Sequence, residues 1–228
     1  MSVIVLLGAP GAGKGTQAPI LADRLGVPIL ASGDLLRAAV AAGTPLGQEA
    51  DAYMRRGELV PDATIVRVFL DRLRQADAEA GAILDGFPRT RTQAEALDEA
   101  LAEDGSRVDR ALYIDVPAED LVRRMANRRV CSVAGHVYNL ATNPPTSPGV
   151  CDVDGSELVQ RPDDREETVR ARMALQLPAL EEVVGHYGQR GVLATADGRR
   201  PIPAVTAELL AALDGAGSPS TPAASAST

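Results

Sequence analysis

The sequence predicts an α/β fold of three layers, in which a parallel sheet of five strands has helices on both faces. Five short apolar stretches have the composition of strands and alternate with longer stretches of helical periodicity. A glycine-rich segment joins the first of these strands to a helical stretch. Such alternation is typical of a parallel sheet, because two parallel strands are joined by a long crossover that is usually a helix.

The elements are assigned in chain order from their apolar periodicity and their flanking residues. The predicted strands are 2–7, 27–30, 82–84, 111–116 and 192–195, and the clearest helical stretches are 63–75, 90–103, 118–127 and 163–190. We expect Pro178 to bend the last helix and Pro19 to remove a hydrogen bond from the first, because proline has no N–H to donate. Residues 130–160 contain glycine, proline, asparagine and aspartate at short intervals, which predicts a small β-rich insertion.

Composition limits the number of domains and the class of partner. The 228 residues, 45% of them hydrophobic, can form one substantial core with excursions from it. The net charge of −8 argues against a nucleic-acid polymer or an anionic membrane as partner, since both require a basic face. We find no signal peptide, no membrane-spanning run and no unexplained apolar stripe, so we expect a soluble, cytoplasmic monomer. Residues 215–228 are all Gly, Ala, Ser, Pro or Thr and predict a disordered tail.

The most informative segment is residues 8–16, Gly-Ala-Pro-Gly-Ala-Gly-Lys-Gly-Thr. Glycines let successive backbone N–H groups point into one concavity, the following helix adds the positive end of its dipole, and Lys14 supplies a cation. The segment therefore predicts a loop that binds the phosphates of a nucleoside triphosphate. In the usual pattern a Mg²⁺-binding Ser or Thr follows the lysine directly, whereas here Gly15 precedes Thr16. The alternative is a glycine-rich turn with an incidental lysine.

Several further segments, taken together, resemble the adenylate kinases of the long, bacterial type, which are P-loop nucleoside monophosphate kinases. The similar segments are Gly-Ala-Pro-Gly-Ala-Gly-Lys-Gly-Thr-Gln at 8–17, Ser-Gly-Asp-Leu-Leu-Arg at 32–37, Leu-Asp-Gly-Phe-Pro-Arg-Thr at 84–90, Asn-Arg-Arg-Val at 127–130, and residues 161–172. The resemblance implies phosphoryl transfer from Mg·ATP to AMP, giving two ADP. It also implies a core of residues 1–30, 61–126 and 165–214, an AMP-binding helical segment at 31–60 and a lid at 127–164.

The resemblance also implies which residues bind the nucleotides. Phosphoryl transfer needs positive charge around a dry site, and arginine suits this role because its planar guanidinium can donate two hydrogen bonds to one phosphate. The implied catalytic cations are Lys14, Arg89, Arg124, Arg128, Arg161 and Arg172. The implied ATP contacts are Gly11, Ala12, Gly13, Lys14, Gly15, Thr16, Arg128, Val137, Tyr138 and Arg200. The implied AMP contacts are Ser32, Arg37, Glu58, Leu59, Val60, Gly86, Phe87, Pro88, Arg89, Gln93, Arg161 and Arg172.

Three of the implied residues have a specific chemical role. Gln93 matches the amide that reads adenine in the family, since an amide offers a donor and an acceptor to one base edge. Ser32 replaces the family's usual threonine but keeps the hydroxyl, so we expect AMP preference to survive. Asp85 is implied to hold Mg²⁺ through water, because Mg²⁺ keeps several of its waters. The alternative for Asp85 is a cap on the following turn.

Cys131 and Cys151, the two cysteines of the chain, lie in the insertion. Related lids that bind zinc carry Cys-x-x-Cys followed by Cys-x-x-Cys or Cys-x-x-Asp, and the matching positions here are Cys131, Ala134, Cys151 and Asp154. One family ligand is therefore missing, and water or His136 is the candidate for the fourth position of a structural zinc. Two alternatives stay open: a metal-free lid held by apolar contacts and hydrogen bonds, and a disulfide, which a reducing cytoplasm disfavours.

Two other functions agree with parts of the sequence. Another nucleoside monophosphate kinase would use UMP, CMP or GMP as acceptor, whereas Gln93 and the long insertion favour AMP. A phosphate-loop switch or binding module would need no second nucleotide site, so Arg37, Asp85, Arg89 and Gln93 together argue against it. The guanine-reading motif Asn-Lys-x-Asp does not occur in the sequence.

Overall fold

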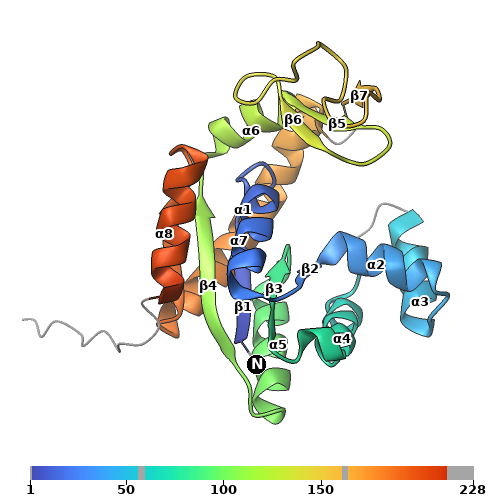
Figure 1. Cartoon of the computed structure of the whole chain (residues 1–228). Coiled ribbons are helices and arrows are strands. Elements are labelled where there is room, and N and C mark those ends of the chain that lie inside the picture. Colours follow the sequence, from blue (N-terminus) through green and yellow to red (C-terminus); the bar gives the residue numbers. More distant parts are fainter. Residues whose placement is uncertain (1, 56–59, 161–163, 215–228) are drawn as a thin grey trace, which may run out of the picture.

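The computed structural model describes residues 2–55, 60–160 and 164–214, without the side chains of residues 37, 54 and 55. Its main sheet has five parallel strands in the order β2-β3-β1-β4-β8 (Figure 1). The strands are β1 (Ser2–Leu7), β2 (Ile29–Ala31), β3 (Gly81–Asp85), β4 (Val108–Asp115) and β8 (Leu193–Asp197). The predicted α/β fold with a five-stranded parallel sheet is confirmed.

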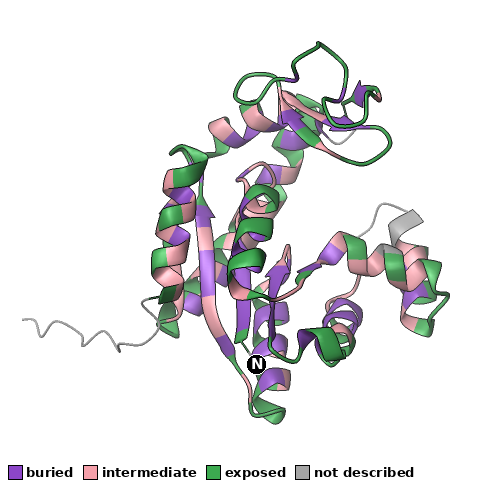
Figure 2. Cartoon of the chain, in the orientation of Figure 1, coloured by how far each residue is buried: buried purple, intermediate pink, exposed green. Residues whose placement is uncertain are grey.

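Helices cover both faces of this sheet. In β1, Ile4 and Leu6 belong to one buried cluster, and Val3, Val5 and Leu7 belong to the other, so alternate side chains point to opposite faces. The first cluster includes residues of α1 (Lys14–Leu25), α6 (Ala118–Ala126), α8 (Ile202–Asp214) and the first half of α7 (Glu166–Gln189). The second includes residues of α4 (Asp62–Leu73), α5 (Arg91–Glu103) and the second half of α7. Figure 2 shows the buried strands between these helices.

Two helices between β2 and α4 form an excursion from the main body (Figure 1). They are α2 (Ser32–Ala41) and α3 (Pro45–Arg55). The two helices pack closely at Gly47, where a Cβ atom would lie 2.0 Å from the carbonyl oxygen of Ala39. A side chain at position 47 would therefore force α2 and α3 apart.

The insertion after α6 forms a second, smaller sheet that is antiparallel. Its strands are β5 (Arg128–Cys131), β6 (Val137–Asn139) and β7 (Leu158–Val159), in the order β6-β5-β7. A small core of its own consists of Cys131, Tyr138, Cys151 and Leu158. The predicted β-rich insertion is confirmed, and we call it the lid.

The predicted elements differ from the structure mainly at their ends. Strand β4 begins three residues before the predicted stretch, and α7 begins at Glu166 instead of residue 163. Both Pro19 and Pro178 lie inside continuous helices, α1 and α7. A short 3-10 turn, Ala76–Ala78, follows α4. Among the described residues, every helix is too short or too polar to cross a membrane. The predicted tail, 215–228, lies outside the described residues.

Candidate active site and lid metal cluster

The glycine-rich loop lies at the carboxyl edge of the sheet, directly after β1. Strand β3 runs beside β1, and its last residue, Asp85, is paired with Leu6, so Asp85 lies next to the loop. Gly11 and Gly13 have φ values of 87° and 108°, which residues with a side chain rarely adopt. Lys14 opens α1, and its Nζ donates to the carbonyl oxygens of Gly8 at 2.8 Å and Ala9 at 3.4 Å. The lysine side chain therefore folds back over its own loop.

Lys14, Asp85 and Arg89 share one electrostatic environment. Burial lowers the pKa of Lys14, and the positive charges of Arg89 and Arg128 lower it further, while Asp85 opposes the shift. Burial likewise raises the pKa of Asp85, although Lys14 and Arg89 act in the other direction. The pKa of Arg89 is lowered by burial and by Arg172, against the effect of Asp85. Lys14 and Arg89 therefore act directly on the Asp85 carboxylate, whereas Arg128 acts on Lys14 and Arg172 acts on Arg89.

Arg89 is held in place by hydrogen bonds to Gly86, which directly follows β3, and to Ser32, at the start of α2. Its Nε donates to the carbonyl oxygen of Gly86 at 2.8 Å, and its Nη2 donates to the Ser32 hydroxyl at 2.9 Å. Ser32 is buried at the start of α2. A Cβ atom on Gly86 would approach the Ser32 oxygen to 3.0 Å, and φ at Gly86 is 72°, so this position needs glycine. Arg89 thus joins the helical excursion to the end of β3.

Gln93, on the first turn of α5, is buried and hydrogen-bonded through both ends of its carboxamide. Its Oε1 accepts from the backbone N–H of Arg89 at 2.7 Å, and its Nε2 donates to Asp62 Oδ1 at 2.7 Å. The other oxygen of Asp62, Oδ2, accepts from the Thr90 hydroxyl at 3.0 Å. Asp62 thereby connects the start of α4 with the start of α5.

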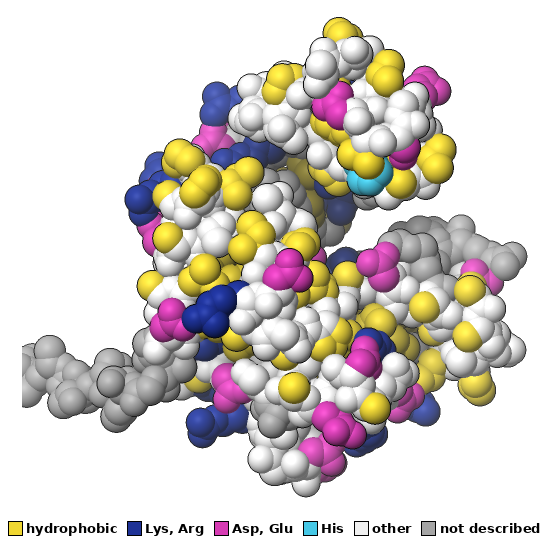
Figure 3. Space-filling model, viewed as in Figure 1, with side chains coloured by type: hydrophobic (Ala, Val, Ile, Leu, Met, Phe, Trp, Pro, Cys, Tyr) yellow, Lys and Arg dark blue, Asp and Glu magenta, His cyan; other side chains and the backbone are white. Residues whose placement is uncertain are grey.

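Two of the predicted catalytic arginines, Arg124 on α6 and Arg128 on β5, donate to a backbone oxygen and to a carboxylate near the base of the lid. Arg128 donates to both oxygens of Asp164, from Nε at 2.8 Å and from Nη2 at 2.5 Å, and Asp164 is fully buried. Arg124 donates to the carbonyl oxygen of Gly198 at 2.7 Å. Arg172 lies on α7 and acts electrostatically on Arg89. Figure 3 shows a hollow beneath the lid, between it and the helical excursion, with Lys and Arg side chains visible around it.

The residues expected at the adenine of ATP have different surroundings. Val137 is 58% exposed on β6, whereas Tyr138 is only 7% exposed and belongs to the lid core. The Tyr138 hydroxyl accepts from the backbone N–H of Asp152 at 2.8 Å. Arg200 forms an ion pair with Glu208 on α8. A contact of ATP with Val137, Tyr138 and Arg200 stays a prediction.

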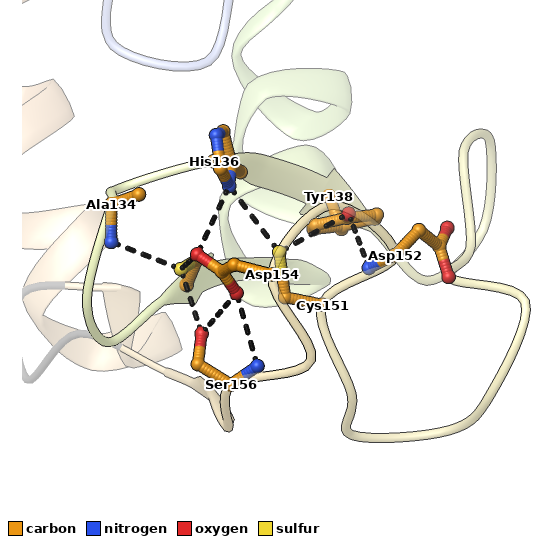
Figure 4. Close-up of polar contacts among 8 residues, drawn as sticks. Ala134, His136, Tyr138, Cys151, Asp152, Asp154 and Ser156 are labelled. Carbon is orange, nitrogen blue, oxygen red and sulfur yellow. Dashed lines mark hydrogen bonds and ion pairs between the residues drawn. The ribbon is translucent and has the colours of Figure 1, made fainter.

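Four side chains in the lid form a cluster of potential metal ligands (Figure 4). The ligand atoms of Cys131, His136, Cys151 and Asp154 all lie within 4.8 Å of one another. Cys131 Sγ is 3.1 Å from Asp154 Oδ2, and His136 Nδ1 is 3.3 Å from Cys151 Sγ and 3.6 Å from Asp154 Oδ2. The sequence spacing left the fourth ligand open, and the structure brings His136 to that place. Ala134, at the family position, instead directs its backbone N–H to Cys131 Sγ at 3.1 Å.

Hydrogen bonds around the cluster lower the pKa of two of its members, Cys131 and Asp154, and so favour their charged forms. Burial acts to raise the pKa of Cys131, but the Ser156 hydroxyl and the Ala134 N–H act against it, and the pKa is lowered to about 7. The Ser156 hydroxyl and N–H also lower the pKa of Asp154. Two sulfurs, an imidazole and a carboxylate form a donor set that suits tetrahedral zinc. The residues present therefore fit a zinc ion, and both cysteines are free thiols in this structure.

Several predicted site residues can be placed, and others lie outside the described residues. Lys14, Ser32, Asp85, Arg89, Gln93 and Arg128 come together, through direct contacts or through electrostatics, at the carboxyl edge of the sheet. Glu58, Leu59 and Arg161, and the side chain of Arg37, fall outside the described part of the chain. The sequence analysis did not identify Asp62 or Asp164, whose contacts depend on the tertiary structure. Asp62 follows Pro61 at a helix start, which is the one local signal it has.

Comparisons with known proteins agree with this geometry. The family model described as "Adenylate kinase" matches residues 6–192. The chain is 48% identical over 211 residues to the adenylate kinase of Thermodesulfovibrio yellowstonii, covering 92% of this chain and 98% of that protein. It is 47% identical over 211 residues to the adenylate kinase of Streptomyces griseus, covering 92% and 96% of the two chains, and 45% identical over 212 residues to that of Bacillus subtilis, covering 93% and 98%.

The glycine-rich loop after β1, the cations Lys14 and Arg89 near Asp85, the lid and the extent of these matches lead to one assignment. The chain belongs to the adenylate kinase family, and it is an enzyme that transfers a phosphoryl group from ATP to AMP, giving two ADP.

Proposed function

We propose that ATP and AMP bind on either side of the cation cluster at the carboxyl edge of the sheet. The donor phosphates would occupy the loop formed by Gly11, Ala12, Gly13, Lys14, Gly15 and Thr16, with Val137, Tyr138 and Arg200 near the adenine. The acceptor would contact Ser32, Arg37, Glu58, Leu59, Val60, Gly86, Phe87, Pro88, Arg89 and Gln93. The observation that carries this proposal is the electrostatic coupling of Lys14, Asp85, Arg89, Arg128 and Arg172 in a chain of net charge −8.

In this proposal the protein accelerates the transfer by positioning and by charge. The AMP phosphate oxygen attacks the terminal phosphorus of ATP in line with the departing ADP oxygen, and negative charge spreads over the oxygens of the transferred group. Lys14 holds the outer phosphates of ATP, and Arg89 orients the AMP phosphate. Arg124, Arg128, Arg161 and Arg172 stabilise the transferred group, because charge-assisted hydrogen bonds are strongest where water is excluded.

Mg²⁺ fits the surroundings of Asp85. Burial raises the pKa of Asp85 in spite of two neighbouring cations, so the carboxylate charge is incompletely compensated. A divalent cation held through water would supply the missing positive charge, and one carboxylate is enough because Mg²⁺ retains most of its waters. When bound with ATP, Mg²⁺ neutralises phosphate charge and helps to orient the phosphates.

We propose that the lid holds one zinc ion through Cys131, His136, Cys151 and Asp154. The close approach of these four donors supports the proposal, as does the N–H of Ala134 directed at a ligand sulfur. The zinc would be structural, since a complete set of protein ligands leaves no open position for substrate. It would link the turns of a lid in which the described residues form a small core cluster of Cys131, Tyr138, Cys151 and Leu158.

We further propose that residues 31–60 and 127–164 move relative to a core of 1–30, 61–126 and 165–214 when nucleotides bind. Closure would exclude water, which would otherwise compete with AMP for the phosphoryl group. Lid closure is a known motion of adenylate kinases, so membership of the family already leads us to expect it. We also propose that the protein acts as a cytoplasmic monomer.

The test is an assay of ADP formation from Mg·ATP with AMP, GMP, CMP or UMP as acceptor, together with metal analysis. We expect AMP to be strongly preferred and about one zinc per chain. His136→Ala should lose the zinc, whereas Asp152→Asn should keep it, because Asp152 accepts from the Thr146 N–H outside the cluster. Equal use of another acceptor would contradict the AMP assignment, and a metal-free wild type would contradict the zinc site.

A further inference from the structure

We infer that Asp62 is a positioning residue that sets the base specificity of the acceptor site by fixing the orientation of the Gln93 carboxamide. The inference rests on the proposed role of Gln93 in reading the acceptor base. It concerns a residue of α4 that is distinct from the phosphate-binding cations. Asp62 acts through Gln93 and is not itself placed in contact with substrate.

The two partners of Gln93 permit a single orientation of its amide. Asp62 Oδ1, as a carboxylate oxygen, can only accept, and it lies 2.7 Å from Nε2. The backbone N–H of Arg89 can only donate, and its nitrogen lies 2.7 Å from Oε1. If the amide were flipped, an oxygen would face the carboxylate and an NH₂ group would face the N–H. Both contacts would then change from attraction to repulsion.

Asp62 is itself held in place, so it can impose this orientation. Its Oδ2 accepts from the Thr90 hydroxyl at 3.0 Å, and the same hydroxyl accepts from the backbone N–H of Gln93 at 3.2 Å. Asp62 also occupies the first turn of α4, where a negative charge is favoured by the helix dipole. Thr90 and Asp62 therefore fix Gln93 at its backbone and at its side chain.

The contacts that fix the amide use half of its hydrogen-bonding capacity. A carboxamide has two N–H donors and two acceptor lone pairs, and Asp62 and Arg89 use one of each. Within the described part of the chain, the remaining N–H and lone pair of Gln93 have no partner. One donor beside one acceptor matches the edge of adenine, which presents the N1 acceptor beside the N6 amino donor.

The fixed orientation distinguishes adenine from its nearest analogue. In hypoxanthine, the base of IMP, N1 carries a hydrogen and position 6 is a carbonyl oxygen, so donor and acceptor are exchanged. A freely rotating glutamine would accept either base by flipping its amide. Because Asp62 and the Arg89 N–H oppose the flip, the site should reject IMP even though IMP has nearly the same shape as AMP. Rejection by an unpaired polar group is stronger than rejection by shape alone.

A purely structural role for the same contacts gives a different expectation. Thr90 caps α5 and Gln93 lies three residues later, an arrangement that resembles a capping box. If Asp62 and Gln93 only joined α4 to α5, their loss would lower stability and leave the preference for AMP over IMP unchanged. The ratio of kcat/KM for the two acceptors therefore separates the two roles.

The test measures kcat/KM for AMP and for IMP, at saturating Mg·ATP, in the full-length wild type, Asp62→Asn and Gln93→Ala. The amide introduced by Asp62→Asn has both a donor and an acceptor, so it can bind the amide of Gln93 in either orientation. We expect the AMP-to-IMP ratio to fall about tenfold in Asp62→Asn, with little change in the KM for ATP. Asp71→Asn is the matched control, because it removes one negative charge from the exposed side of the same helix. Its ratio should equal that of the wild type.

The Gln93→Ala variant separates failure of this inference from failure of the proposed function. If Gln93→Ala reduces the ratio but a folded Asp62→Asn does not, Asp62 does not position the amide and the inference is wrong. If Gln93→Ala leaves the ratio unchanged, Gln93 does not read the base at all. Should Asp62→Asn not fold, the side-chain NH₂ signals of Gln93 in the wild type decide the matter. Both protons should exchange slowly with AMP bound, and rapid exchange of the proton facing Asp62 would overturn the inference.

Discussion

Lys14 is the only lysine of the chain, which makes its side-chain chemistry accessible to a single measurement. Burial lowers its pKa below the ordinary value, so at a given pH more of the amine is neutral and nucleophilic than in a free lysine. We expect an amine reagent to label Lys14 at a lower pH than it labels a model lysine peptide. ATP should suppress the labelling, because its phosphates favour the ammonium form and cover it. Mass spectrometry of the labelled peptide would detect both effects, and unchanged labelling with ATP would contradict the placement of Lys14 at the phosphates.

Asp85 predicts a pH dependence of stability at the same site. Its pKa is raised in the folded state, chiefly by burial, so the folded protein binds a proton more readily than the unfolded chain. The stability contributed by this group is present at low pH and is lost as the pH rises through the raised pKa. Asp85→Asn has no titratable group at this position. With metal absent from both proteins, the unfolding free energy of the variant minus that of the wild type should therefore increase from pH 4 to pH 7. We also expect the variant to lose activity. A relative stability that is flat with pH would contradict the burial of this charge.

The fourth potential metal ligand, His136, shows what the sequence alone could not decide. The spacing of Cys131, Cys151 and Asp154 indicated a metal cluster, but it assigned the remaining family position to Ala134. His136 reaches the cluster because the turn after β5 reverses the chain, and the Cys131 N–H donates to the His136 carbonyl oxygen at 2.8 Å. The family spacing identifies the sequence positions that hold metal ligands in related lids, whereas the turn determines which side chains of this chain lie close together.

At the scale of elements, the bidentate contact of Arg128 with Asp164 connects the first lid strand with the segment that leads into α7. Asp164 is fully buried, so replacing Arg128 by lysine would leave part of a buried carboxylate unpaired. We expect Arg128→Lys to lower the unfolding free energy by about 1–3 kcal/mol and to reduce kcat/KM. Arg123→Lys is the control, since its pair with Asp120 is exposed and should change stability by about 0.5 kcal/mol or less. Chemical denaturation gives both values, and equal effects would contradict a special role of the pair.

The lid sheet predicts a local response to metal removal. In the described residues the lid has its own sheet and its own small core, separate from the five-stranded sheet. If zinc links its turns, a chelator should speed amide hydrogen exchange throughout 128–160 and leave β1, β3 and β4 protected. Exchange that rises equally in the lid and in the main sheet would show that the lid does not unfold separately.

The bounds of some strands can be predicted from the sequence, and those of others cannot. Strand β1 was predicted with its bounds, because both faces of Val3–Leu7 are buried and the stretch is apolar throughout. Strand β4 starts earlier than predicted, at residues that include Asp109 and Arg110. Asp109 accepts from the Val3 N–H at 3.1 Å, and Arg110 donates to the Ala212 carbonyl oxygen at 3.2 Å. These partners are about a hundred residues away along the chain, so no local pattern could reveal that polar residues continue the strand.

At the scale of the whole molecule, the distribution of exposed apolar side chains predicts a monomer. Among the residues that the structure describes, the most exposed large apolar side chains are Val133 and Val153 in the lid, at 80% and 70%, and Leu175 on α7, at 79%. A lasting dimer needs a contiguous apolar face, and an interface built on the lid would hinder the closure proposed above. We therefore expect sedimentation equilibrium to give a mass near 23.8 kDa at all concentrations, with and without nucleotides. A mass that rises with concentration would contradict this prediction. The variant Leu175→Glu would then show whether α7 forms the interface, because a buried charge there should restore the monomer.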